Sequence, residues 1–182
     1  MQVLTHSIAG LLEFQPRIFG DPRGAFFESF SARTMEALGL PRHDWVQDNQ
    51  SISRAGTLRG LHFQRPPHAQ AKLVRVAQGR ALDVVVDLRP ASPTFGQHAT
   101  VELTAELGNV LYVPVGFAHG FVALADDTLF LYKCSDYYAP AAEGGLRWDD
   151  SALGIDWGFA GEALVSPKDA VLPTLAEFES PF

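Results

Sequence analysis

Cysteine is almost absent from this sequence: Cys134 is the only one among 182 residues, which excludes a disulfide within the chain. It lies in an apolar stretch, 128–134, so we expect a buried and unreactive thiol. A chain without cross-links fits a reducing compartment, and we expect a cytoplasmic protein. The sequence is 47% hydrophobic and 19% charged, which predicts a single domain over residues 1–182 with a core of its own.

Long apolar runs and positive charge are also scarce. No stretch reaches the roughly eighteen consecutive apolar residues of a membrane helix, and no Lys or Arg precedes Arg17, so we expect neither membrane insertion nor export. The 14 basic and 21 acidic residues give a formal net charge of −7, which disfavours nucleic-acid binding. A small anionic ligand remains compatible, because a few basic side chains in one cleft set the local potential.

Helical periodicity is missing from the chain after Lys72. Short runs rich in β-branched residues alternate there with turn residues such as Gly79, Pro90 and Gly108. This spacing is typical of an all-β sandwich or barrel and disfavours a doubly wound α/β sheet. The expected strands are 72–77, 81–88, 100–103, 110–113, 120–124 and 129–134.

A few short helices are expected outside the sheets. Ser31 is a suitable N-cap for a helix over 32–38, and Gly39 would end it. A second short helix is indicated over 168–172, between two prolines, and would pack on a sheet.

One segment resembles the second motif of the cupin superfamily, whose members are small double-stranded β-helix jelly rolls. Gly108, Pro114, Gly116 and His119 follow one another at the spacing of that motif. The resemblance implies an all-β jelly roll whose strands direct polar side chains into the mouth of the barrel.

The first cupin motif is altered at its metal ligands. His62 is present, but Gln64 and Lys72 stand where metal-binding cupins carry a second His and a Glu. An amide is a poor ligand for transition metals, and an ammonium group repels a cation. We therefore expect no metal at this site. His62, Lys72 and His119 would instead handle protons and stabilise an anion.

A closer resemblance covers nearly the whole chain: the sequence is similar to the dTDP-4-dehydrorhamnose 3,5-epimerase family. The matching stretches are 19–28, 47–51, 58–64, 72–76, 92–96, 114–120, 132–138 and 166–169. The resemblance implies a homodimer of jelly-roll subunits that acts on a dTDP-4-keto-6-deoxyhexose without a cofactor. It also implies inversion of C3 and C5 of dTDP-4-dehydro-6-deoxy-D-glucose, which yields dTDP-4-dehydro-L-rhamnose.

Epimerisation next to a ketone requires a base, an acid and stabilisation of the enolate between them. His62 is the predicted base, and the resemblance implies that Asp169 pairs with it and orients it. Lys72 would stabilise the enolate oxygen, with His119 as an assistant or a binding group. Tyr132 is the predicted acid on the opposite face of the sugar.

Further residues are predicted to bind the substrate because they match contact positions of the family. Arg23 and Arg59 suit the diphosphate, since a guanidinium makes bidentate bonds to phosphate oxygens. Tyr138 would stack on the thymine ring. The predicted binding residues are Arg23, Glu28, Gln47, Asp48, Asn49, Arg59, Lys72, His119, Tyr138, Glu143 and Lys168.

Three other functions stay open at the level of the sequence. Relatives of the same family could invert a single carbon, C3 or C5, of a related deoxysugar nucleotide in natural-product biosynthesis. A metal-dependent cupin is a second alternative, which Gln64 and Lys72 disfavour. A sugar-nucleotide sensor without activity is a third, which the joint presence of His62, Tyr132 and Asp169 disfavours.

Overall fold

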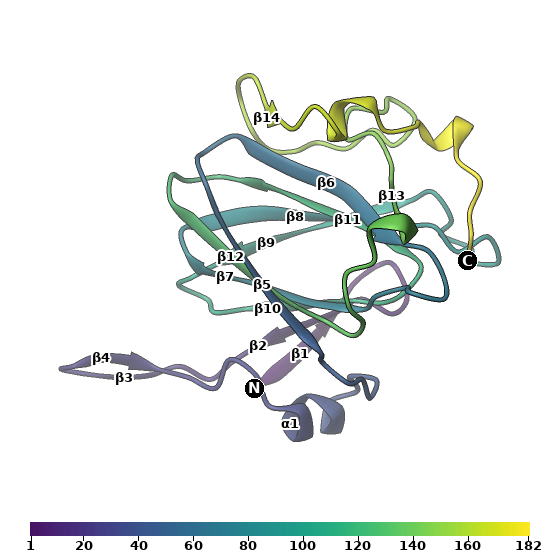
Figure 1. Ribbon diagram of the computed structural model, residues 1–182. Helices are drawn as coiled ribbons and strands as arrows, with labels where there is room; N and C mark the ends of the chain where they lie inside the picture. Colours follow the sequence, from purple (N-terminus) through teal and green to yellow (C-terminus); the bar gives the residue numbers. More distant parts are fainter.

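Two sheets face each other in the computed structural model, which describes residues 1–182 (Figure 1). In spatial order, the first sheet contains β1 (Gln2–Thr5), β2 (Leu12–Gln15), β10 (Val110–Val113), β7 (Lys72–Gln78), β12 (Thr128–Cys134) and β5 (Gln47–Ser53). The second contains β13 (Glu143–Gly145), β6 (Thr57–Gln64), β11 (Phe117–Ala123), β8 (Arg80–Asp87) and β9 (His98–Thr104). Both sheets are antiparallel, except that β14 (Leu164–Val165) pairs in parallel with β6. The predicted all-β jelly roll is confirmed.

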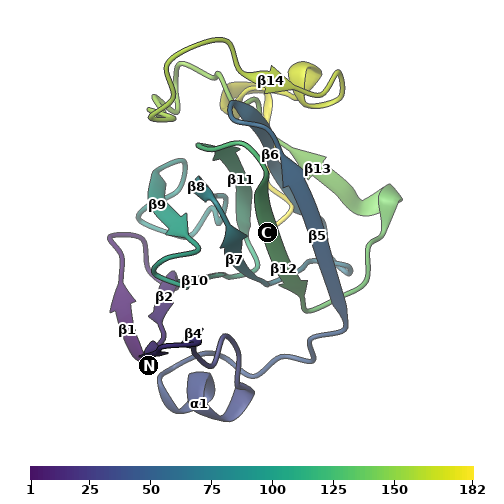
Figure 2. The same cartoon turned by 90° about the vertical axis from the view of Figure 1, so that its left-hand side faces the viewer.

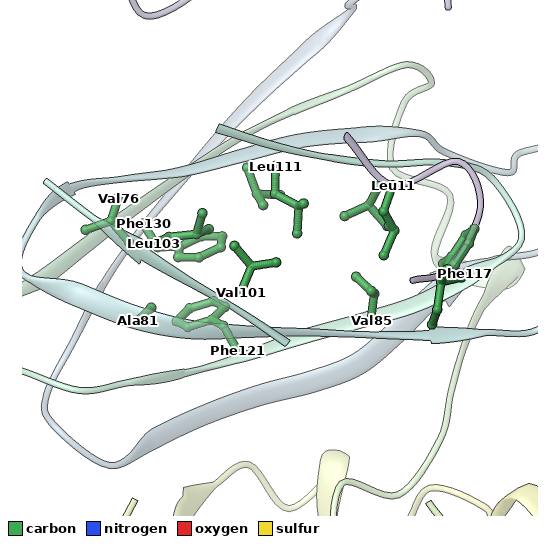
Figure 3. Packing of buried hydrophobic residues seen from close by; sticks show 13 residues of the cluster. Leu11, Val76, Ala81, Val85, Val101, Leu103, Leu111, Phe117, Phe121 and Phe130 are labelled. Carbon is green, nitrogen blue, oxygen red and sulfur yellow. The ribbon is translucent and has the colours of Figure 1, made fainter. Parts of the chain in front are cut away.

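Apolar side chains fill the space between the two sheets (Figure 3). Successive residues of a strand point to opposite faces, so Val74 and Val76 of β7 point inward while Leu73 points outward. The rings of Phe121 on β11 and Phe130 on β12 stack 3.9 Å apart between the sheets. This core holds the two sheets at a fixed separation.

The outer faces of the sandwich are covered by different parts of the chain (Figure 2). α1 (Ala32–Ala37) lies against the first sheet, where Met35 packs with Phe14 and Tyr112. The segment after β13 covers the second sheet and carries β14, η2 (Asp169–Val171) and η3 (Leu175–Glu177). Another single 3-10 turn, η1 (Pro140–Ala142), precedes β13. No helix here has the length and apolar character needed to cross a bilayer.

The strands and helices expected from the sequence are present with small shifts at their ends. All six strands predicted after residue 71 correspond to β7 to β12. Ser31 caps α1 by accepting a hydrogen bond from the Thr34 amide, and Gly39 follows the helix with φ +103°. The helix expected over 168–172 is the single 3-10 turn η2. The strands before residue 72 were not predicted.

A hairpin of β3 (Phe19–Asp21) and β4 (Gly24–Phe26) projects away from the sandwich (Figure 1). It pairs with neither of the two large sheets. Its Phe26 is 73% exposed, and Phe19 on the opposite strand is also exposed. The hairpin thus presents two apolar rings to its surroundings.

Candidate active site

Polar side chains replace the apolar core at one end of the sandwich. A cavity of about 450 Å³ opens there, and its walls come from β5, β6, β7, β11, β12 and the segment around η2. An adjoining cavity of about 290 Å³ lies toward the loop that follows β12. Three residues line both cavities, namely His62, Lys72 and Tyr132. The two cavities therefore form one cleft.

His62 on β6 is paired with a buried carboxylate. Its Nε2 lies 2.6 Å from Oδ1 of Asp169 on η2, the pairing that the family resemblance implies. The amide of Gly60 donates to the second carboxylate oxygen, and the Asp169 amide donates to Ser166 Oγ. Burial alone would raise the pKa of Asp169, but the hydrogen bonds to its carboxylate, led by that from His62, hold it below its ordinary value. An ionised Asp169 fixes the imidazole with its Nε2–H toward the carboxylate.

A second histidine–carboxylate pair lies beside the first and was missed by sequence reasoning. His119 is opposite His62 in the ladder between β11 and β6, and its Nε2 lies 2.8 Å from Asp83 Oδ2. Asp83 on β8 is completely buried, and burial raises the pKa of its carboxyl against the opposing effect of His119. The available signal was a carboxylate within an apolar strand, because buried carboxylates are rare unless they are paired.

Lys72 and Tyr132 stand on the first sheet, across the cleft from His62. The Lys72 ammonium lies 6.0 Å from the centre of the Tyr132 ring. Burial lowers the pKa of Lys72, although nearby Cys134 and Asp83 oppose this shift. Burial also raises the pKa of Tyr132, so its phenol keeps its proton at neutral pH. The cleft therefore has an imidazole on one wall and a protonated phenol on the other.

Three linked side chains lie along the cleft: Tyr138 and Glu143 line the adjoining cavity, and Lys168 lines the larger one. The Tyr138 hydroxyl donates to Glu143 at 2.7 Å, and Glu143 forms an ion pair with Lys168 at 2.6 Å. Burial alone would raise the pKa of Glu143, but its bonds to Lys168 and Tyr138 lower it. Tyr138 is 54% exposed, so part of its ring is free to contact a ligand.

Other predicted binding residues lie on the walls of the cleft. Gln47 and Asn49 of β5 line the adjoining cavity and are joined by a side-chain hydrogen bond of 3.0 Å. Arg59 lines the larger cavity and donates to Ser53 Oγ at 3.3 Å. Its guanidinium brings positive charge to the cleft, which suits an anionic ligand.

Three predicted binding residues are not brought to the cleft of this chain. Asp48 lies on the opposite face of β5 from its neighbours and pairs with Lys133 at 2.9 Å, because adjacent residues of a strand point to opposite faces. Arg23 lies on the projecting hairpin, where its side chain is 90% exposed and paired with Asp21. Glu28 lines a separate surface hollow near the hairpin.

The cupin ligand positions do not fit a metal ion in this chain. Nowhere do three His, Cys, Asp or Glu side chains converge in a way that could hold one. Gln64 directs its amide to backbone groups of two loops, and the Lys72 ammonium repels a cation. Asp169 and Asp83 are each committed to a histidine.

The opposed walls of the cleft support removal of a proton on one side and delivery on the other. This is the chemistry of racemases and epimerases, here built on a cupin-type jelly roll. One protein-family model, described as dTDP-4-dehydrorhamnose 3,5-epimerase, matches residues 5–177. The chain belongs to this family, and the resemblance seen in its sequence is confirmed.

Known relatives agree along nearly the full length of the chain. The dTDP-4-dehydrorhamnose 3,5-epimerase of Salmonella typhimurium is 49% identical over 96% of each chain. A Legionella pneumophila epimerase solved with dTDP-4-keto-L-rhamnose is 44% identical, with a TM-score of 0.92 over 98% of this chain and 94% of the other. A 3'-monoepimerase of Streptomyces bikiniensis solved with dTDP-quinovose is 39% identical, with a TM-score of 0.88 over 97% and 88%.

Proposed function

We propose that this chain inverts C3 and C5 of dTDP-4-dehydro-6-deoxy-D-glucose to give dTDP-4-dehydro-L-rhamnose. The observation that carries the proposal is the placement of His62 and Tyr132 on opposite walls of one cleft, with Lys72 beside them. The names of relatives that are 44–49% identical, and the dTDP-4-keto-L-rhamnose bound to the Legionella enzyme, support this substrate.

His62 removes the proton from the carbon next to the ketone. Its Nε2–H is held by ionised Asp169, so the lone pair of Nδ1 is the one free to accept the proton. The imidazolium that forms is stabilised by the carboxylate 2.6 Å away. The electron pair of the broken C–H bond moves into the carbonyl and gives an enolate.

The enolate oxygen is stabilised by the positive charge of Lys72, which lies in a partly desolvated position where such an interaction is strong. His119, held by buried Asp83, lines the same cavity beside it. The resulting effect on the barrier is about 3 to 4 kcal/mol, by comparison with other buried donors to an oxyanion.

Tyr132 delivers a proton to the other face of the enolate, and this step inverts the carbon. Its raised pKa keeps the phenol protonated until the carbanion is formed. The nearby charge of Arg59 favours the phenolate that remains. Solvent then returns a proton to Tyr132 and takes one from His62, and the same cycle serves the second carbon on the other side of the ketone.

The nucleotide part of the substrate fits the adjoining cavity. Tyr138 presents a partly exposed ring for the thymine there, while Arg59 and Lys168 of the larger cavity offer positive charge to the diphosphate. Gln47 and Asn49 supply amide groups at the same wall.

We further propose a homodimer in which the β3–β4 hairpin of one chain reaches the cleft of its partner. The projecting hairpin, the exposed ring of Phe26 and the distance of Arg23 and Glu28 from their own cleft support this arrangement. Arg23 would then contact the diphosphate bound by the partner. The cytoplasmic location expected from the sequence remains a prediction.

A single-carbon epimerase is the second candidate function, because a 3'-monoepimerase is also among the similar structures. Solvent deuterium distinguishes the two. The purified protein is incubated with dTDP-4-dehydro-6-deoxy-D-glucose in deuterated water, and the product is examined by NMR and mass spectrometry. We expect deuterium at C3 and C5 with inversion at each, and none with the His62→Ala variant. Inversion at one carbon would favour the second candidate, and binding without any label would favour a sensor.

A further inference from the structure

The buried side chain of Gln64 connects two loops at the edge of the cleft. It stands at the end of β6, opposite Glu143 of β13. Its Nε2 donates to the carbonyl of His68 at 2.7 Å and to that of Tyr137 at 3.2 Å. Its Oε1 accepts from the amide of Ala139 at 2.8 Å. Both donor hydrogens and the acceptor oxygen of this amide are thus used by backbone groups.

The loop that follows β12 is held at successive backbone groups by three glutamines. Gln70 donates to the carbonyl of Asp136 at 2.7 Å, and Gln47 accepts from the amide of Tyr138 at 2.9 Å. Gln64 binds the groups on either side of Tyr138, namely the carbonyl before it and the amide after it. Gln47 comes from the first sheet and Gln64 from the second, so the loop is tied to both sheets.

The ring of Tyr138 is fixed separately at its far end. Its hydroxyl donates to Glu143 at 2.7 Å, and Glu143 lies opposite Gln64 in the ladder. The backbone groups that flank Tyr138 and its hydroxyl are therefore anchored to the β6–β13 pair, and its own amide is anchored to β5, while 54% of the residue stays exposed. A ring held in this way is ready to stack without further loss of conformational freedom.

We propose that Gln64 is a positioning residue for nucleotide binding: it fixes Tyr138 in the orientation that stacks on the base. The inference rests on the proposed function, because it assumes a nucleotide in the adjoining cavity. Gln64 stands at the second metal-ligand position of the cupin motif, and in this chain its polar atoms bind the backbone of two loops. Gln64 acts on binding through Tyr138 and takes no part in proton transfer.

The test compares Gln64→Met and Gln64→Glu with the wild type, by calorimetric titration with dTDP and by steady-state kinetics. Gln64→Met loses all three bonds, whereas Gln64→Glu keeps the acceptor and loses both donors. At the usual strength of such bonds, we expect KM and the Kd for dTDP to rise about 10- to 100-fold in both variants. We expect kcat to change less than about twofold, because His62, Lys72 and Tyr132 keep their contacts.

A matched control is Gln15→Met on β2. This glutamine is half-buried and, like Gln64, hydrogen-bonded through its side chain, to Gln2 and Glu13, but it lies outside both cavities. We expect it to leave the Kd for dTDP and kcat unchanged. If Gln64→Met does not fold, Gln70→Met tests the same loop from its other anchor, with a smaller rise in the Kd for dTDP.

A double-variant cycle separates positioning from a general structural role. If Gln64 acts through Tyr138, the variant carrying both Gln64→Met and Tyr138→Ala binds dTDP no more than about twofold more weakly than Tyr138→Ala alone. The inference would be overturned if the two substitutions raised the Kd for dTDP by the product of their separate effects. It would also be overturned if kcat fell by the same factor as KM rose. If the wild type takes up deuterium but both Gln64 variants bind dTDP as tightly as the wild type does, the inference about Gln64 fails and the proposed function stands. A wild type that neither binds dTDP nor exchanges overturns the proposed function.

Discussion

Two histidines occupy opposite positions on neighbouring strands, and each is held by one buried carboxylate. Their surroundings differ, since hydrogen bonds lower the pKa of Asp169 while burial raises that of Asp83. His62 therefore has a firmly ionised partner that can stabilise an imidazolium. The partner of His119 is the fully buried carboxyl group of Asp83, which also lies near the Lys72 ammonium. The His62–Asp169 pair is therefore suited to a base that gains a proton, whereas the His119–Asp83 pair is suited to hold a polar group in place on the wall of the cavity.

The role of Asp169 is tested by the Asp169→Asn variant. The amide cannot hold His62 with Nε2–H directed toward it and cannot stabilise the imidazolium, so we expect kcat to fall about 10²- to 10⁴-fold. The measurement is deuterium uptake into the substrate under saturating conditions. Asp149→Asn is the control, because Asp149 is exposed and paired only with Arg147. Equal rates in Asp169→Asn and the wild type would remove the pair from the mechanism.

Tyr132→Phe separates proton removal from inversion. The ring is kept and the donor is lost, so His62 can still remove a proton and return it to the same face. We expect substrate that gains deuterium with its configuration retained, while the rate of product formation falls about 10²-fold or more. NMR of the recovered sugar nucleotide distinguishes the two events. Full inversion by the variant would assign the acid to another residue.

The alkaline limb of the rate profile reports on Lys72. Burial lowers its pKa from the ordinary value of 10.5, so the ammonium loses its proton and its effect on the enolate as pH rises through this lowered pKa. As pH rises, we expect kcat to begin to decrease before pH 10.5 is reached. We expect this alkaline decrease to be absent in Lys72→Arg, whose guanidinium stays charged. Lys133→Arg on the outer face serves as control. A profile of Lys72→Arg identical to that of the wild type would contradict the assignment.

Sequence reasoning found the residues of the cleft that belong to a motif, and it missed or misplaced those that depend on the fold. The spacing around His62 and Lys72 indicated their proximity, and the segment around Asp169 indicated the carboxylate partner. Asp83 has no motif and becomes relevant only because β8 lies beside β11. Asp48 was assigned with its neighbours, but strand alternation turns it to the outer face.

The elements that the sequence predicted best have an apolar face against the core. β8 and β10 consist largely of buried aliphatic residues, so their runs were visible. β5 reads Gln-Asp-Asn-Gln-Ser-Ile-Ser, because one face lines the cleft and the other is exposed, and no hydrophobic alternation marks it. In β6 the register shifts near Gly60, where an added Cβ would lie 2.6 Å from Gly120. A strand whose side chains line a polar site thus lacks the alternation of apolar and polar residues by which a strand is predicted from sequence.

The connection between β8 and β9 depends on one carboxylate at the end of β8. Asp87 is buried and accepts hydrogen bonds from Arg89, Ser92 and Thr94, which lower its pKa although burial alone would raise it. We expect Asp87→Asn to lose about 2 kcal/mol of stability at pH 7, measured by urea unfolding.

The pH dependence of this loss follows from the direction of the shift. A carboxylate with a lowered folded pKa stabilises above its unfolded pKa of about 3.9, and this stabilisation is lost as pH falls toward the folded pKa. The difference in the free energy of unfolding between wild type and Asp87→Asn should therefore have its full size at pH 7 and become smaller below about pH 4. Asp127→Asn, in an exposed turn, is the control. A difference that stays constant down to pH 3 would exclude an ionised Asp87 as the cause.

At the scale of the whole molecule, the hairpin of β3 and β4 makes the proposed dimer testable by complementation. Arg23→Ala and His62→Ala chains are each expected to be weakly active alone. Mixed after unfolding and refolding, half of the dimers are heterodimers, in which one cleft combines intact His62 with intact Arg23 of the partner. Roughly a quarter of wild-type activity should return under statistical mixing. No recovery, in a mixture shown to contain heterodimers, would show that Arg23 does not act in the cleft of its partner.

The base and its carboxylate partner are separated by 107 positions in the chain. During synthesis the ribosome releases β6 long before η2, and every strand of the two facing sheets, β14 included, emerges before Asp169 does. A chain that stops before residue 169 would therefore carry all the strands but lack the carboxylate that pairs with His62. Full activity is therefore expected only from chains that have been translated through Asp169, because only these can hold His62 in the orientation of the base.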